Sequence, residues 1–300
     1  MTVTRFLVRH RTEYRYDEPV TAGHTVTRLE PRPLPHQQVL HTGMDVDPEP
    51  SRHSRYVDHF GNHATYLAFD DPHTVLSVTA SSEVELAVRP PLGDGWVVPW
   101  EDVVAATGRD RTDDGLAARA CRLDSPLVRR HPDLAGFAAA SFAIGRPWAE
   151  AATDLTTRIF HDFEFVPGAT DVTTPVLEVL VARRGVCQDF AHLLLGALRS
   201  LGLAARYVSG YVETEPPSDD PAAPGLVGAE ASHAWVALYV PGTGWVDLDP
   251  TNGLVHPTRH ITVGWGRDYT DVAPVRGVVV GPPVHQNLHI TVSVQSVDRS

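Results

Sequence analysis

Residues 183–202, RRGVCQDFAHLLLGALRSLG, contain Cys187, one of only two cysteines in this 300-residue chain. The apolar residues after it recur at helical spacing and predict a helix that begins near Cys187 and ends at Gly202. Unpaired amides at a helix N-terminus favour an anion, and Gly185 lets the chain turn sharply into the helix. Because a thiolate is a far better nucleophile than a thiol, this position suits a catalytic cysteine. The alternative is a structural cysteine, since free cysteine is among the most buried residue types.

A nucleophilic cysteine needs a base, and His233 is the histidine whose position fits that role. It opens the predicted strand SHAWVALYV directly after a polar, proline-rich loop, and functional side chains often emerge where strands meet such loops. The turn PGTG brings the next strand, GWVDLD, back antiparallel, which places Asp249 near His233. A carboxylate there accepts from the imidazole and fixes its orientation. The sequence therefore predicts Cys187, His233 and Asp249 as nucleophile, base and orienting acid, with Asp247 as the alternative orienter.

The rest of the chain changes its hydrophobic period twice. Period-two alternation, interrupted by Gly, Pro, Asn and Asp, fills residues 1 to about 90 and is typical of an antiparallel β-sandwich. The connector PPLGDGWVVPW follows, the period then becomes helical up to about residue 202, and it returns to two for strands at 203–213, 232–240 and 245–249.

These changes predict an α+β protein with three parts. An N-terminal β-sandwich domain occupies residues 1–95, and residues 96–275 hold helices packed on an antiparallel sheet. Residues 276–300 contain one more strand, HQNLHITVSVQSV, whose pattern resembles that of the N-terminal strands. The N-terminal sheet is therefore its candidate partner.

Composition narrows the class of protein. Hydrophobic residues make up 42% and charged residues 21% of the chain, as in soluble globular proteins, and the net charge of -12 argues against a nucleic-acid or anionic-membrane partner. No apolar run approaches the roughly 20 residues that span a bilayer, and the N-terminus lacks a signal core. Two cysteines cannot form a disulfide framework and fit a reducing compartment, so we expect a cytoplasmic protein. Neither a metal motif nor a nucleotide fingerprint is present, so no metal or cofactor is expected, and the oligomeric state stays open.

Four motifs in a fixed order, GVCQDFAHL, ARYVSGY, SHAWV and GWVDLDPTNG, resemble the core of the bacterial transglutaminase-like family. That family is related in fold to animal transglutaminases and papain-like cysteine proteases. Residues 1 to about 90 resemble the β domain that accompanies this core in bacteria, and HITVGWGRDYTDVAPVRG resembles the segment that follows it. The resemblance implies a core of papain/transglutaminase type. It also implies Cys187 as nucleophile, His233 as base and Asp249 as the third catalytic residue.

Several neighbours are candidates for the walls of the site. Trp235 shares the face of His233, and Tyr207, Ser209 and Tyr211 alternate on one face of their strand. With Gln188, which opens the helix, Trp235 and Tyr207 are the expected substrate contacts. The polar loop 214–230 is expected to form a rim of the cleft.

Two further helix residues are expected to be structural, and one catalytic group is missing. Asp189 suits the first helical turn, and His192 lies about 140° around the helix from Cys187, which favours a packed side chain. The papain pattern supplies a glutamine for the oxyanion a few residues before the cysteine, and VLVARRGV has none. The second oxyanion donor is therefore unassigned.

These features together predict a cysteine-dependent acyl-transfer enzyme that acts on peptide or glutamine-type amide bonds through a thioester. Water as acceptor would make it a peptidase or amidase, and an amine would make it a protein-glutamine transglutaminase. Hydrolysis is favoured because water needs no second binding site. The remaining alternative is a non-catalytic binding scaffold on the same fold, which needs none of the three catalytic residues.

Overall fold

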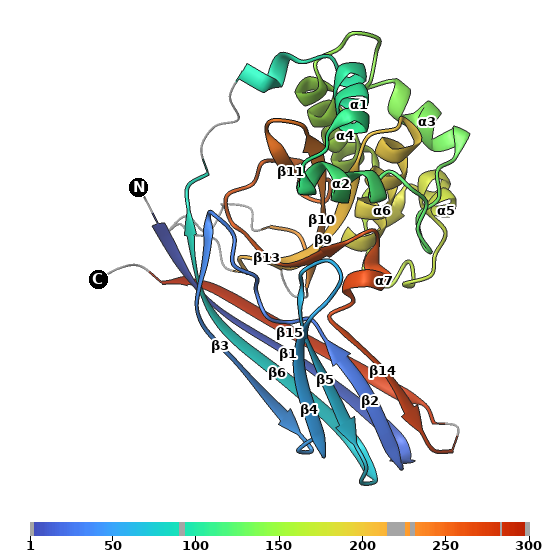
Figure 1. Cartoon of the computed structure of the whole chain (residues 1–300). Coiled ribbons are helices and arrows are strands. Elements are labelled where there is room, and N and C mark those ends of the chain that lie inside the picture. Colours follow the sequence, from blue (N-terminus) through green and yellow to red (C-terminus); the bar gives the residue numbers. More distant parts are fainter. Residues whose placement is uncertain (1–2, 90–93, 215–225, 229–231, 283, 298–300) are drawn as a thin grey trace, which may run out of the picture.

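The computed structural model describes residues 3–89, 94–214, 226–228, 232–282 and 284–297. Figure 1 shows two long β-sheets on one side of the molecule and a group of helices around a further sheet on the other. None of the helices in these ranges combines the length and the apolar character that a membrane crossing requires.

The β domain consists of two four-stranded antiparallel sheets. The first has the order β15-β1-β6-β3 and is made of β1 (Val3–Val20), β3 (Gln37–Asp47), β6 (His73–Ala87) and β15 (Gln286–Val297). The second has the order β14-β2-β5-β4 and is made of β2 (Ala22–Thr27), β4 (Arg52–Val57), β5 (His63–Phe69) and β14 (Val275–Val280). Each sheet thus takes an edge strand from the C-terminal end of the chain.

The long first sheet packs on two different partners. One half contributes Tyr16, Leu76 and Val78 to a core shared with Leu67 and Phe69 of the second sheet. The other half extends past the second sheet and packs on strands of the helical part through a separate apolar cluster made of Phe6, Val8, Val84, Leu86, Val292, Val294, Tyr211, Ile261 and Val263. The β domain is therefore joined to the rest of the protein by an apolar cluster that both parts share.

Helices occupy most of the chain between the β domain and residue 200. They are the 3-10 helix η1 (Asp94–Val97) and the α-helices α1 (Trp100–Arg109), α2 (Asp113–Ala120), α3 (Pro132–Ala139), α4 (Trp148–Asp162), α5 (Val176–Ala182) and α6 (Cys187–Ser200). A short parallel pair, β7 (Glu164–Phe165) and β8 (Arg184–Gly185), lies among them. The apolar residues Trp148, Ala152, Leu155 and Ile159 recur at helical spacing and form one face of α4, and all four are fully buried.

The third sheet has the order β12-β11-β10-β9-β13, from β9 (Ala205–Val212), β10 (His233–Val240), β11 (Gly244–Asp249), β12 (Leu254–Val255) and β13 (His260–Gly266). One face, with Val236, Leu238 and Leu248, packs on α6 and the other helices, while Tyr211 and Ile261 face the β domain. Layers on both faces explain why every residue of β10 is buried. The α+β architecture expected from the sequence is confirmed.

Two strands, rather than one, return to the β domain from the C-terminal region. β14 joins the second sheet beside β2, and β15 joins the first sheet beside β1, from Tyr16↔Gln286 to Arg5↔Val297. The sequence analysis described one strand within 276–300 and did not separate β14, which begins at Val275. The sandwich is therefore built from both ends of the chain, and residues 1–95 supply only six of its eight strands.

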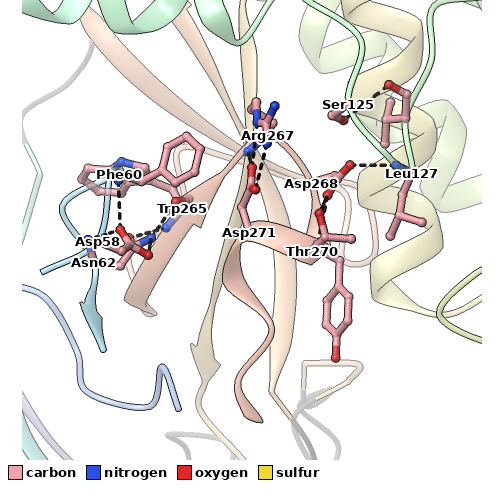
Figure 2. A network of polar contacts seen from close by, with 12 residues as sticks. Asp58, Phe60, Asn62, Ser125, Leu127, Trp265, Arg267, Asp268, Thr270 and Asp271 are labelled. Carbon is pink, nitrogen blue, oxygen red and sulfur yellow. Dashed lines mark hydrogen bonds and ion pairs between the residues drawn. The ribbon is translucent and has the colours of Figure 1, made fainter. Parts of the chain in front are cut away.

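Polar contacts fix the segment between β13 and the short helix α7 (Tyr269–Val272) to both of its neighbours (Figure 2). On the β-domain side, the Asn62 side chain donates to the Trp265 carbonyl and accepts from the Trp265 amide, each at 2.9 Å. On the helical side, an Asp268 carboxylate oxygen accepts from the Leu127 amide at 2.8 Å. These contacts hold Tyr269, the next residue, in a defined place.

Candidate active site

Cys187 is the first residue of α6 and lies half-buried in the wall of a cleft. The first turn of α6 is stabilised by Asp189, whose carboxylate accepts from the Val186 amide at 2.8 Å and from the Thr170 hydroxyl at 2.6 Å. Gly185 serves this cap in a way that differs from the sequence expectation. Its φ is not in the left-handed region, but a Cβ there would lie 2.7 Å from an Asp189 oxygen. Glycine is needed for space rather than for a sharp turn.

The cleft has a volume of about 710 Å³ and is bordered by several separate elements. Its lining includes Cys187 and Gln188 of α6, Tyr207 and Ser209 of β9, His233 of β10, Tyr269 of α7 and Ile290 of β15. Thr214 and residues 226–228 of the expected rim loop also line it, whereas residues 215–225 and 229–230 of that loop lie outside the described residues. The cleft therefore runs from the helix that carries Cys187 to the edge of the β domain.

His233 and Asp249 form a fully buried pair beside Cys187. The imidazole Nε2 lies 2.9 Å from Asp249 Oδ2, so the other ring nitrogen, Nδ1, faces away from the carboxylate. A Cβ placed at Gly228 would lie 3.0 Å from Nδ1, which puts this nitrogen on the side of the cleft. Burial alone would lower the pKa of His233, but the charge and hydrogen bond of Asp249, together with Cys187, outweigh it and raise the pKa to about 10. The ring therefore carries its proton at neutral pH.

A second histidine, His260 at the start of β13, shares the same carboxylate. Its Nε2 lies 2.8 Å from Asp249 Oδ2, and Asn252 donates to that oxygen at 2.8 Å. Burial by itself would raise the pKa of Asp249, but the charge and hydrogen bond of His233 and the bond from His260 hold it far below its usual range. For His260 burial wins over the attraction of Asp249, and its pKa is lowered. Asp249 is therefore a carboxylate, His233 an imidazolium and His260 a neutral imidazole.

Among the described residues, His233, Asp249 and His260 form the group whose side chains could hold a cation, because their ligand atoms all lie within 4.8 Å of one another. Asp249 Oδ2, however, lies at hydrogen-bond distance from both imidazole rings, at 2.9 and 2.8 Å. One oxygen shared by two ring nitrogens is the geometry of a hydrogen-bonded network. The hydrogen bonds orient both imidazole rings, and the arrangement does not need a metal ion to hold it together.

Trp235 does not line the cleft, and the structure corrects the substrate contact expected for it. Its side chain is fully buried and packs on two imidazole rings, stacked on His233 at 6.1 Å between centroids and edge-on to His260 at 5.0 Å. Alternation along β10 turned Trp235 to the face of His233 as expected, but there it lies in an apolar cluster with Trp265, and Arg32 of the β domain covers the Trp265 ring. The indole helps to shield His233 and His260 from water.

Asp247, the alternative orienter, is committed elsewhere. It lies on the same face of β11 as Asp249 but pairs with Arg89, whose Nη1 lies 2.6 Å from its Oδ2. Arg89 follows β6, so this buried ion pair ties the β domain to the strand that carries Asp249. The structure thus brings His233 to Asp249 and leaves Asp247 a structural role.

The other expected neighbours divide between the cleft and the packed interior. Tyr207 and Gln188 both line the cleft, and the Gln188 side-chain amide donates to the Val172 carbonyl at 3.2 Å. Tyr211 instead lies in the junction with the β domain, where its hydroxyl contacts His10 Nδ1 at 3.1 Å. His192 is buried, and its Nε2 accepts from the Tyr269 amide at 3.2 Å. It therefore supports a wall of the cleft from behind.

Sequence reasoning missed His260, Asn252 and Arg89. His260 lies beyond β11 in the chain, but β13 pairs with β9 on the far side of the sheet, so its distance from Asp249 follows from the topology and not from local spacing. Asn252 was within reach, because an Asp-Pro-Thr-Asn turn places an amide three residues after the carboxylate. Arg89 comes from another domain, and no sequence pattern near it indicates its contact with Asp247.

Comparison with known proteins places the chain in a family. Residues 6–85 match the bacterial transglutaminase-like N-terminal region, and residues 138–250 match the transglutaminase-like superfamily. An uncharacterized protein of Mycobacterium tuberculosis is 37% identical over 297 residues, which cover 97% of this chain and 92% of that protein. A protein-glutamine gamma-glutamyltransferase of Pseudomonas aeruginosa is 37% identical over 71 residues, 23% of this chain and 10% of that protein.

Among solved structures, a candidate cysteine protease from Cytophaga hutchinsonii has the same fold, with a TM-score of 0.76 and 19% identity over 100% of this chain and 93% of that one. The fold and the site define a member of a superfamily of cysteine-dependent enzymes. The chain belongs to the transglutaminase-like superfamily and carries the N-terminal region found with it in bacteria. The resemblance carried by the four sequence motifs is thereby confirmed, as is the core of papain/transglutaminase type.

Proposed function

We propose that the protein is a cysteine-dependent acyl-transfer enzyme that acts on peptide or glutamine-type amide bonds, with water as the acceptor. The observation that carries the proposal is the arrangement of Cys187 at the wall of a cleft with His233, whose far nitrogen is bound to Asp249. A scaffold without catalysis would not require a charged histidine and a carboxylate to be buried beside a cleft cysteine, because burying such charges is costly.

The reaction follows from the roles of these three residues. The Cys187 sulfur attacks the amide carbon, the carbon–nitrogen bond breaks, and His233 gives its proton to the departing amine, which leaves a thioester on Cys187. A water molecule then attacks the thioester, His233 takes a proton from it, and the carboxylic acid leaves as the thiolate is restored. Asp249 stays ionised throughout and keeps the ring oriented and its charge balanced.

The oxyanion of each tetrahedral intermediate needs two donors. The Cys187 main-chain amide at the start of α6 is one. Tyr207 and Gln188 are the candidates for the other, and the bond from Gln188 to Val172 favours Tyr207. Burial, and after it the charge at Cys187, raises the pKa of Tyr207 well above its ordinary value, so the hydroxyl keeps its proton and stays a donor.

Transfer to an amine is the second candidate. The likeness to the Pseudomonas aeruginosa protein-glutamine gamma-glutamyltransferase over 71 residues supports it, and the two reactions share every residue named above. Water is preferred as the acceptor because it requires no second binding site. A cytoplasmic location is part of the proposal, since a thiol nucleophile works best where cysteines stay reduced and both cysteines of the chain are unpaired.

Turnover in the presence and absence of an amine tests the proposal. β-Casein and a blocked Gln-Gly dipeptide would be incubated with the protein, with and without a primary amine, and the products identified by mass spectrometry. We expect cleaved peptide bonds or deamidated glutamine without the amine, and no product from Cys187→Ala. An amine adduct formed in preference to the hydrolysis product would assign the transferase, and equal products from Cys187→Ala would refute the enzyme.

A further inference from the structure

The open edge of β15 borders the cleft. β15 is the outermost strand of the first sheet, paired on one side with β1 along its whole length. Ile290, near its middle, lines the same cavity as Cys187 and His233, although it comes from the β domain. A strand edge that reaches a catalytic cleft is a possible template for an extended polypeptide, because it presents unpaired main-chain donors and acceptors.

The direction of the β15 main chain can be worked out from its contacts. Val294 donates its amide to the Thr214 hydroxyl at 3.0 Å, and its carbonyl accepts from the Thr214 amide at 3.0 Å, on the side away from β1. The His285 carbonyl, by contrast, accepts from the amide of Asp17 of β1 at 3.2 Å. Since alternate residues of an antiparallel strand face opposite sides, Leu288 and Ile290 point their amides and carbonyls the same way as Val294.

The outward main-chain amides and carbonyls of Leu288 and Ile290 have no hydrogen-bond partner among the residues that the structure describes. Farther along the same edge, Thr214 already pairs with Val294. Because Thr214 occupies Val294, the outward groups left open run from Leu288 to Val292, a distance of four residues or about 13 Å in a strand. That length suits a bound segment of about four residues.

The side chains of β15 also lack the features that usually protect an edge. Gln286–Val297 contains no Lys, Arg, Asp, Glu or Pro, and Leu288 and Ile290 are 52% and 36% exposed. Natural edge strands are commonly blocked by charges, prolines or bulges. The opposite edges of the two sheets do have such features, because β4 carries Arg52 and Arg55 and β3 has an irregularity between Val39 and His41.

We propose that β15 is the docking strand for the substrate. An extended segment of the substrate polypeptide adds to its open edge beside Leu288 and Ile290 and thereby leads the reactive amide to Cys187. Side chains of the segment that turn toward Ile290 and Tyr269 meet an apolar wall, so apolar or aromatic residues are preferred there. The inference rests on the proposed function and narrows it to unfolded or extended polypeptides rather than small free amides.

Proline substitution at an outward amide tests the docking strand. Ile290→Pro removes a donor that faces the cleft and leaves the hydrogen bonds to β1 in place. Val279→Pro on β14 is the matched control. The Pro274 and Val280 carbonyls accept hydrogen bonds on the β2 side, so by alternation the amide of Val279 points outward. This outer edge does not border the cleft. The readout is the ratio of kcat/KM for β-casein to kcat/KM for the blocked Gln-Gly dipeptide.

We expect Ile290→Pro to lower this ratio about tenfold, which corresponds to the loss of one hydrogen bond of ordinary strength. Val279→Pro should leave the ratio unchanged. Equal ratios in the two variants would overturn the docking strand. Circular dichroism establishes that both variants fold.

A binding measurement keeps the inference separate from the catalytic proposal and independent of any folding defect. Hydrogen exchange of the β15 amides is followed in Cys187→Ala with and without β-casein. Slower exchange at Leu288 and Ile290 in the presence of β-casein supports docking even if no turnover is found. Unchanged exchange at these amides overturns docking even if turnover is found. Protection that grows with protein concentration without casein would assign the edge to a second copy of the chain and also overturn the proposal.

Discussion

Replacing Asp249 by Asn tests how the protein keeps His233 protonated. The carboxylate supplies the largest influences that raise the pKa of His233 to about 10, against burial, which lowers it. In Asp249→Asn burial becomes dominant, and the pKa should fall below the ordinary value of about 6.5. The alkaline limb of kcat/KM, which reports loss of the His233 proton, should therefore move from near pH 10 to acid by about three pH units or more.

The assay is kcat/KM for β-casein hydrolysis between pH 5 and pH 10.5, in steps of about half a unit. The expected fall in kcat at neutral pH is about 100-fold to 10,000-fold, the usual range for losing a general acid or base. Asp247→Asn is the matched control, because Asp247 is on the same strand and is also buried but pairs with Arg89. An alkaline limb that stays near pH 10 in Asp249→Asn would refute the assignment of Asp249 as the group that charges His233.

Three further predictions concern stability and the oxyanion. The stabilisation that comes from protonated His233 should be fully present below about pH 6.5 and lost as the pH rises through about 10. In urea denaturation, the difference in the free energy of unfolding between the unsubstituted protein and Asp249→Asn should therefore shrink over this range. A difference that stays constant would contradict the prediction. Gly185→Ala should lower the free energy of unfolding by about 1–3 kcal/mol, since the new Cβ would lie 2.7 Å from an Asp189 oxygen. Gly136→Ala in α3, where a Cβ has no atom within 4 Å, should be neutral or stabilising. Equal denaturation midpoints for the two variants would count against the role of Gly185 in this cap. Tyr207→Phe should slow peptide turnover about 100-fold more than it slows alkylation of Cys187, because alkylation forms no oxyanion, and equal slowing would remove Tyr207 from that role.

The sequence predicted the elements that carry chemistry better than the contacts between domains. The helix at Cys187, the hairpin that joins His233 to Asp249 and the apolar face of α4 all follow from local periodicity and turn signals, which act over a few residues. Trp235 was expected at the substrate because it shares the strand face of His233. Here it lies in an apolar cluster with Trp265 of β13, and no local pattern could indicate this.

Long-range pairings explain what else was missed. β14 and β15 complete sheets that begin more than 250 residues earlier in the chain, and Arg89 reaches Asp247 across 158 residues. Such contacts depend on how the domains assemble. For the same reason His260 was recognised as part of the site only from the strand order: β11 and β12 separate it from His233 along the chain, but in the sheet only β9 lies between their strands.

The reactivity of Cys187 toward iodoacetamide at about pH 6 tests the central claim most directly. Cys121 is a poor reference, since burial raises the pKa of its thiol and its slow labelling would follow from inaccessibility alone. The better references are free glutathione and the His233→Ala protein, with modification of each peptide followed by mass spectrometry. The account predicts that Cys187 reacts faster than glutathione and that His233→Ala removes the advantage. Labelling of Cys187 no faster than glutathione, and unchanged in His233→Ala, would show that the cysteine is not activated and would contradict the proposed enzyme.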